Sequence, residues 1–278
     1  MKKFFLLLLF LLVAWFAWNL IHRSTPPSDT QIREMSFNVN TFRSEAGNGS
    51  RYLVASLLQM HQPQVVCLQE VVLQSGGLGL EEFAQTNGYP YNRLHEEYIP
   101  GKRVGIAILS RFPVLRDTVF RIGLEREERY AQAVVLDVEG REVTVLNTHF
   151  SNRDFWAVEG VLQALQQEYL SENLRTLQAR SVINFLDCGW ATDRLLLAGD
   201  LNTLPFSRAW RSLRSRLRGT AGWRDLLQPT YKVEYQVHID YIFTSNSLTK
   251  LEYRILPTGA SDHNPLLVTL GLVIQPDD

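Results

Sequence analysis

The chain has 278 residues, of which 45% are hydrophobic and 21% charged, and its formal net charge at pH 7 is -1. This composition is typical of a globular protein and excludes a largely disordered chain. The near-zero charge argues against bulk electrostatic binding to nucleic acid, so any contact with a polyanion must be local. No linker rich in Pro, Gly or Ser divides the chain after residue 30, which favours one domain over residues 31–271 and a tail at 272–278.

The N-terminus begins with an apolar run from Phe4 to Ile21, preceded by Lys2 and Lys3. As a helix this run would be about 27 Å long, just enough to cross a bilayer. No small-residue cleavage site clearly follows it, so residues 1–23 favour an uncleaved signal anchor over a cleaved signal peptide. The preceding lysines predict a cytoplasmic N-terminus, a tether at 24–30, and the rest of the chain on the periplasmic or extracellular side. A cleaved peptide would instead make the protein secreted.

The predicted elements mix strands and helices, which indicates an α/β fold. The first are a strand at 32–39, a helix at 51–60, a strand at 64–68 and a short helix at 78–86. Four strands follow at 104–110, 114–122, 130–138 and 142–148. Helical periodicity then covers 156–187 with a break near Ser171, a strand lies at 195–197, and a helix covers 205–217. The chain closes with strands at 238–243, 251–256 and 266–270.

The two cysteines and a cluster of arginines are each given a structural interpretation first. Cys67 stands in an apolar run and is interpreted as a buried hydrophobe, although a disulfide with Cys188 stays open for an exported domain. Arg211, Arg214 and Arg218 are predicted to share one helical face. Such a face is usually solvated surface, and binding of phosphate or lipid is the alternative.

Polar residues recur at the ends of the predicted strands. After the apolar run 195–198, Gly199 permits a tight turn, and the spacing of Asp200 and Asn202 puts both side chains on one face of an extended chain. An Asx turn is the structural alternative. The same position at or beside a strand end is shared by Asn38, Glu70, His149, Asp200, Asn202, Asp240, Asp262 and His263.

These residue types indicate the chemistry. Carboxylates with few cysteines favour a hard cation such as Mg²⁺ over structural zinc. The chain has no Walker loop, no GxSxG and no HExxH sequence, so the mechanisms that depend on those motifs have no anchor here.

Seven short motifs follow one another between residues 31 and 271, namely SFNVN, CLQE, GIAILSRFPV, NTHF, AGDLNT, HIDYIF and SDHNPL. In this order they resemble the endonuclease/exonuclease/phosphatase superfamily, which includes DNase-like nucleases, exonuclease-III-type enzymes and neutral sphingomyelinases. The resemblance implies a four-layer α/β sandwich of two mixed sheets with outer helices, the DNase-like fold, preceded here by the N-terminal hydrophobic helix.

The resemblance also implies residue roles. Glu70 is expected to be the principal metal ligand with Asn38 beside it, and Asp262 is expected to bind or support the metal. Asn40, predicted to share a face with Asn38, departs from the acidic residue that some relatives carry there.

The catalytic residues that the resemblance implies are His149, Asp200, Asn202, Asp240 and His263. Asp200 would orient or deprotonate the attacking water, and Asn202 would hold phosphate oxygens. His263 would contact the phosphate or act as the base, oriented by Asp240. His149 would donate to the scissile phosphate or the leaving oxygen.

The leading hypothesis is therefore a monomeric, exported or membrane-tethered phosphodiesterase that uses Mg²⁺, or alternatively Mn²⁺, on nucleic acid. A sphingomyelinase-like enzyme acting on a phospholipid is the alternative, and a phosphomonoesterase acting on inositol phosphates is less favoured. A catalytically inactive binding module on the same fold is the hypothesis from another class.

Overall fold

The computed structural model describes residues 30–72, 79–99, 102–123, 129–152, 161–233 and 235–273. The first strands are β1 (Gln31–Asn38), β2 (Val65–Val71), β3 (Tyr91–Ile99), β4 (Lys102–Ser110), β5 (Val114–Arg121) and β6 (Tyr130–Val138). The later strands are β7 (Arg141–His149), β8 (Leu195–Asp200), β9 (Arg218–Gly219), β10 (Asp240–Thr244), β11 (Leu248–Ile255) and β12 (Leu266–Leu272). The helices are α2 (Arg51–His61), α3 (Leu80–Thr86), α4 (Val161–Tyr169), α5 (Leu174–Asp187) and α6 (Arg208–Arg214), with 3-10 turns η1 (Asn40–Phe42) and η2 (Asp225–Leu227).

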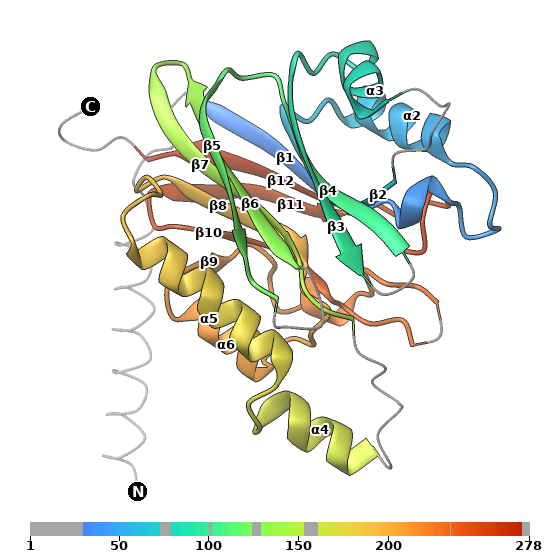
Figure 1. Ribbon diagram of the computed structural model, residues 1–278, viewed down its shortest axis with the longest axis vertical. Helices are drawn as coiled ribbons and strands as arrows, with labels where there is room; N and C mark the ends of the chain where they lie inside the picture. The colour runs from blue at the N-terminus through green and yellow to red at the C-terminus, as the bar shows by residue number, and fades with distance from the viewer. Residues whose placement is uncertain are drawn as a thin grey trace, which may run out of the picture.

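Two six-stranded mixed sheets pack against each other (Figure 1). The strand order is β11-β12-β1-β2-β4-β3 in the first sheet and β5-β6-β7-β8-β10-β9 in the second. The parallel pairs are β1–β2 and β7–β8, near the centre of each sheet. Because β8 and β12 are buried along their whole length, they appear in the sequence as apolar runs without alternation.

Three hydrophobic clusters separate four layers. Leu58 and Phe83 belong to the cluster that covers the first sheet with α2 and α3. Val145 and Val268 belong to the cluster between the sheets. Helices α5 and α6 lie side by side on the outer face of the second sheet, where Val182 contributes to the third cluster (Figure 1). The predicted four-layer sandwich is confirmed.

A buried polar clamp joins the two sheets. Asn147 on β7 donates hydrogen bonds of 2.9 Å to the carbonyl oxygens of Leu68 and Ala107 in the first sheet, and its own oxygen accepts from Gln69 Nε2 at 2.8 Å. Since buried polar groups are costly to leave unpaired, this network favours the observed alignment of the sheets.

Some sequence-based expectations were wrong. Strand β3 was not predicted, because its sequence YNRLHEEYI carries polar residues throughout and does not alternate clearly. Helix α6 ends at Arg214 and Arg218 lies in β9, so the expected shared face of Arg211, Arg214 and Arg218 does not exist. The predicted break near Ser171 is confirmed between α4 and α5.

The cysteines do not form a disulfide. Cys67 is buried, as predicted, and Cys188 is exposed, and both are free.

The predicted signal anchor or signal peptide at 1–23 lies outside the described residues, as do most of the tether and most of the tail. Among the helices in the described ranges, none has the length and apolar character needed to cross a membrane.

Candidate active site

The ends of β7, β8 and β10 bring three predicted residues together. His149 on β7 is opposite Asp200 on β8, and Asp240 at the start of β10 is opposite Asp200 from the other side. The three side chains therefore lie at one edge of the second sheet, and all are buried.

Gly199 allows β7 and β8 to approach. Its φ is +153°, and a Cβ built there would lie 1.9 Å from the carbonyl oxygen of Thr148. The predicted tight turn is wrong, because β8 continues through Gly199 to Asp200. The glycine is needed for close packing of the strands that carry His149 and Asp200.

The first sheet contributes Asn38 and Glu70. Asn38 ends β1, and its Nδ2 lies 3.0 Å from Asp200 Oδ2 and 3.4 Å from Glu70 Oε1. Glu70 has a φ of +53° at a register shift in β2, which is typical of a β-bulge that redirects a side chain. Asn38 thus links a carboxylate of one sheet to a carboxylate of the other.

Asn40 does not share a face with Asn38. Strand β1 ends at Asn38, and Asn40 begins the η1 turn with a φ of +43°. Its backbone N–H donates to Asn38 Oδ1 at 3.0 Å. Asn40 therefore orients the Asn38 amide through its backbone.

Asn202 does not have the extended backbone that the predicted shared face with Asp200 requires. Its φ is +47°, and its backbone N–H donates to Asp200 Oδ1 at 2.9 Å, so the Asx-turn alternative is the correct one. Its side chain donates to the carbonyl oxygen of Phe150 at 3.1 Å. Asp200 and Asn202 remain adjacent through a turn, and they do not project from one face of a strand.

Asp200 is the most buried acid of the group, at 1% exposure. Burial, together with the Asp240 carboxylate, raises its pKa to about 7 against the opposing influence of His263 and Asn38. A carboxyl group that exchanges protons near neutral pH is suited to acid–base work.

His263 and His149 both approach Oδ2 of Asp200. The Nδ1 atom of His263 is 2.9 Å from Asp240 Oδ2, and its Nε2 is 3.7 Å from Asp200 Oδ2. Burial alone would lower the pKa of His263, but the Asp240 and Asp200 carboxylates outweigh burial and raise the pKa to about 10. The predicted pairing of Asp240 with His263 is present.

Asp262 is partly buried and belongs to a loop fixed to the end of β1. The Ser261 hydroxyl donates to the carbonyl oxygen of Asn38 at 2.7 Å and lies 3.1 Å from Asp262 Oδ1. The backbone N–H of His263 donates to the same hydroxyl at 3.2 Å. Ser261 therefore positions this loop, a role that the sequence did not reveal.

Two further residues were missed by the sequence analysis. Arg129 Nη1 lies 3.0 Å from His149 Nδ1 and 3.5 Å from Glu97 Oε2, and both charged residues are buried. Burial raises the pKa of Glu97 to about 7, although Arg129 opposes this. Glu97 lies on the unpredicted strand β3, and Arg129 ends a run of charged residues that resembles solvated surface.

The donor atoms fit a hard divalent cation. Ligand atoms of Asp200, Asp240 and His263 lie within 4.8 Å of one another, and Asn38 joins Glu70 to this cluster. Oxygen donors dominate, which favours Mg²⁺ or Mn²⁺. The expected ligand set of Glu70, Asn38 and Asp262 differs from this group and stays a prediction.

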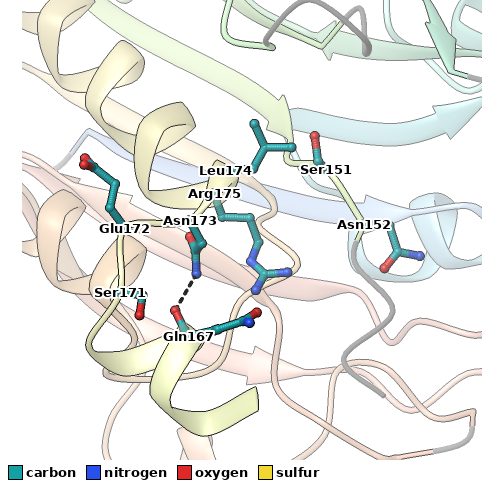
Figure 2. A pocket seen from close by; sticks show the side chains of 8 residues that line it. All are labelled: Ser151, Asn152, Gln167, Ser171, Glu172, Asn173, Leu174 and Arg175. Carbon is teal, nitrogen blue, oxygen red and sulfur yellow. Dashed lines mark hydrogen bonds between the residues drawn. The ribbon is translucent and has the colours of Figure 1, made fainter. Parts of the chain in front are cut away.

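A polar pocket of about 600 Å³ lies beyond the end of β7 (Figure 2). The Arg175 side chain extends into it, and Arg175 pairs with the buried Glu168. Glu168 Oε1 accepts from the backbone N–H of Leu204 at 3.0 Å and also from Thr203, which braces the turn after Asn202. The pocket is lined by Ser151, Asn152, Gln167, Ser171, Glu172, Asn173, Leu174 and Arg175.

Comparison with known proteins agrees with the observed fold. Residues 35–263 match the model of the Endonuclease/Exonuclease/phosphatase family. A Beutenbergia cavernae endonuclease/exonuclease/phosphatase is similar at 22% identity and a TM-score of 0.68, over 87% of this chain and 72% of that one. The human Nocturnin catalytic domain with bound sulfate has 19% identity and a TM-score of 0.67, over 90% and 100%. ANGEL2, a 2',3'-cyclic phosphatase in complex with adenosine-2',3'-vanadate, has 14% identity and a TM-score of 0.69, over 88% and 96%. No curated protein sequence matches significantly.

Proposed function

This chain belongs to the endonuclease/exonuclease/phosphatase family, whose members hydrolyse phosphodiesters or phosphate monoesters, and we propose that it is a divalent-metal-dependent phosphodiesterase acting on nucleic acid. The observation that carries the proposal is the surroundings of Asp200 Oδ2. Asn38 Nδ2 lies 3.0 Å from it, His149 Nε2 3.6 Å and His263 Nε2 3.7 Å. In this arrangement the buried carboxylate can accept a proton while the neighbouring histidines donate hydrogen bonds to phosphate oxygens.

In the proposed reaction, Asp200 orients a water molecule and takes its proton as the water oxygen bonds to phosphorus and the ester P–O bond breaks. The pKa of about 7 suits Asp200 to this step. The leaving oxygen then takes a proton from bulk water to become an alcohol, and Asp200 releases its own proton to solvent. His263, whose pKa of about 10 keeps it protonated at neutral pH, donates to a phosphate oxygen and does not act as the base. Asn202 has two amide N–H groups, and the one not bonded to Phe150 serves a second phosphate oxygen.

Glu70, Asn38 and Asp262 are the residues proposed to hold the cation. A bound Mg²⁺ or Mn²⁺ would neutralise negative charge on the phosphate and on the leaving oxygen.

Nucleic acid is the favoured substrate class for two reasons. Arg211 and Arg214 are exposed on α6 and form a local positive surface, although the net charge of the whole chain is close to zero. Trp223 is exposed with the Arg224 guanidinium 5.2 Å from its ring centroid, an arrangement on which an unpaired base can stack. The nucleotide analogue bound to ANGEL2 is consistent with this choice.

A phospholipid substrate is the second candidate. Leu162, Leu170 and Phe206 are exposed apolar side chains, and Arg211 bonds to the carbonyl oxygens of Tyr169 and Phe206. Apolar side chains beside cations suit contact with a lipid surface. The proposed anchor at 1–23 would hold a monomeric enzyme at the outer face of a membrane, where either substrate is accessible.

The test is hydrolysis by the full-length chain purified in detergent. Substrates are plasmid DNA, single-stranded DNA, RNA, sphingomyelin vesicles, bis-p-nitrophenyl phosphate and p-nitrophenyl phosphate, each with Mg²⁺, Mn²⁺ or EDTA. We expect EDTA-sensitive cleavage of nucleic acid and of the diester probe. Asp200→Asn should lower the rate by about 1,000-fold, because it removes the proton acceptor at constant volume.

Asp187→Asn is the matched control, since Asp187 forms an exposed ion pair with Arg216. Cleavage of sphingomyelin alone would support the lipid candidate. Preference for p-nitrophenyl phosphate would replace the proposal with a phosphomonoesterase. No turnover despite cation binding would favour the inactive binding module.

A further inference from the structure

The two histidines beside Asp200 have partners of opposite charge. His263 Nδ1 bonds to the Asp240 carboxylate at 2.9 Å, whereas His149 Nδ1 lies 3.0 Å from the Arg129 guanidinium. A carboxylate only accepts hydrogen bonds, and a guanidinium only donates them. The two rings must therefore carry their protons differently.

The contact with Arg129 determines which ring nitrogen of His149 carries the proton. Arginine has no acceptor atom and remains charged in proteins, so His149 Nδ1 must accept. A ring whose Nδ1 accepts carries its proton on Nε2. Nε2 is the atom that lies 3.6 Å from Asp200 Oδ2, so the N–H of His149 is directed at the reactive carboxylate.

Arg129 is itself held in place. Its side chain is 3% exposed, and its Nη1 lies 3.5 Å from Glu97 Oε2. The other oxygen of Glu97 accepts from the backbone N–H of Tyr130 at 2.8 Å. Because Glu97 is anchored to the residue that follows Arg129, the guanidinium has little freedom to leave the His149 ring.

We propose that Arg129 is a positioning residue that fixes His149 as the Nε2–H tautomer, so that His149 is a constant hydrogen-bond donor at the reaction centre. The reaction part of this inference rests on the proposed phosphodiesterase activity. His149 stabilises a phosphate oxygen by donating to it, and it does not transfer a proton to the leaving group. This departs from the prediction that His149 donates to either the phosphate or the leaving oxygen.

The first test is spectroscopic and needs no substrate. We would record ¹⁵N NMR spectra of the imidazole nitrogens in the full-length chain with Mg²⁺ near pH 7, and assign His149 by loss of its signals in His149→Gln. We expect a protonated Nε2 and an unprotonated Nδ1. A proton on Nδ1, or on both nitrogens, would overturn the inference.

The second test separates positioning from structural support. Arg129→Lys keeps a cationic donor that has no acceptor atom, so it should keep the Nε2–H tautomer and stay within about 10-fold of the wild-type rate. Arg129→Met combined with Glu97→Met removes both buried charges together, so neither is left unpaired. This double variant should show mixed tautomers and lose about 10-fold to 100-fold in kcat with little change in KM.

Exposed Arg216→Met is the control and should leave the His149 signals unchanged. If the double variant is unstable, the wild-type spectrum and the Arg129→Lys spectrum still test the tautomer of His149. An unaltered tautomer in a folded double variant would overturn the inference. If the spectra agree with it while no diester is hydrolysed, the proposed function fails and the tautomer assignment stands.

Discussion

Asp240 Oδ2 lies 2.9 Å from Nδ1 of His263, and the other nitrogen of that ring faces Asp200 Oδ2 at 3.7 Å. Asp240 lies on β10 and Asp200 on β8, so the two carboxylates come from different strands, and the His263 ring lies between them. Asp240 and Asp200 together outweigh the effect of burial on His263 and keep the ring charged at neutral pH. The protonated His263 ring is therefore a fixed cation beside Asp200, the carboxylate that we propose as the general base.

Replacement of Asp240 by Asn should disable this cation. Asp240 is the strongest influence that raises the pKa of His263, so in Asp240→Asn the pKa should fall towards its ordinary range. We expect kcat on bis-p-nitrophenyl phosphate to drop by about 100-fold or more near pH 8, because the ring is no longer protonated there, and the alkaline limb of the pH–rate profile to move to lower pH. Asp187→Asn is the control, and an unchanged pH–rate profile for Asp240→Asn would contradict the assignment.

The same histidine should make stability depend on pH. His263 has an ordinary pKa of 6.5 and a pKa of about 10 in the folded protein, so between these values the folded state binds more protons than the unfolded state. Stability from this group is complete below about pH 6.5 and is lost as the pH rises towards 10. Urea unfolding should show a decline of a few kcal/mol over this window, by the linkage of pKa to stability.

His263→Gln should flatten that decline, and His61→Gln should not, because the pKa of His61 is lowered by burial, so this residue contributes no loss of stability as the pH rises. An equal decline in His263→Gln would mean that another group causes it.

The sequence predicted the fold and most of the candidate site, and the misses have physical causes. Strand ends such as those before Asp200 and His149 are recognisable because buried strands are uninterrupted apolar runs. The positive φ values of Asn40 and Asn202 are local departures from strand geometry, so spacing arguments failed there. Arg129 and Glu97 meet only through the pairing of distant segments, and each alone resembles surface charge.

Removal of Glu70 should abolish the response of stability to Mg²⁺. A ligand that binds only the folded state stabilises it in proportion to the logarithm of its concentration, about 2.7 kcal/mol at 100 times Kd. Thermal unfolding of the wild type should therefore shift upwards with Mg²⁺, and Glu70→Gln should shift little. Exposed Glu82→Gln is the matched control. A full Mg²⁺ shift in Glu70→Gln would remove Glu70 from the ligand set.

Gly199 should tolerate no side chain. In Gly199→Ala the new Cβ would meet the Thr148 carbonyl oxygen at 1.9 Å, so β7 and β8 must separate and carry His149 and Asp200 apart. We expect loss of activity and destabilisation by more than about 2 kcal/mol, the upper cost of a positive φ alone. Gly189→Ala measures the cost of a left-handed φ without a steric clash, because Gly189 has a φ of +78° and no atom within 4 Å of its built Cβ. Similar unfolding midpoints for the two variants would refute a steric role.

Asn147 should contribute to stability and to catalysis at once. Asn147→Ala removes both hydrogen bonds to the first sheet and the shortest hydrogen bond of Gln69 Nε2, which keeps weaker contacts with the Cys67 carbonyl oxygen and the Ser36 hydroxyl. The loss should be about 2–4 kcal/mol in urea unfolding, since buried polar groups are left unsatisfied and a cavity forms. Exposed Asn48→Ala should change stability by less than about 0.5 kcal/mol.

Because Gln69 is followed directly by Glu70, and Asn147 lies two residues before His149, Asn147→Ala should also weaken hydrolysis at temperatures where it remains folded. A stable, fully active Asn147→Ala protein would show that the apolar contacts between the sheets suffice to align the two halves of the site.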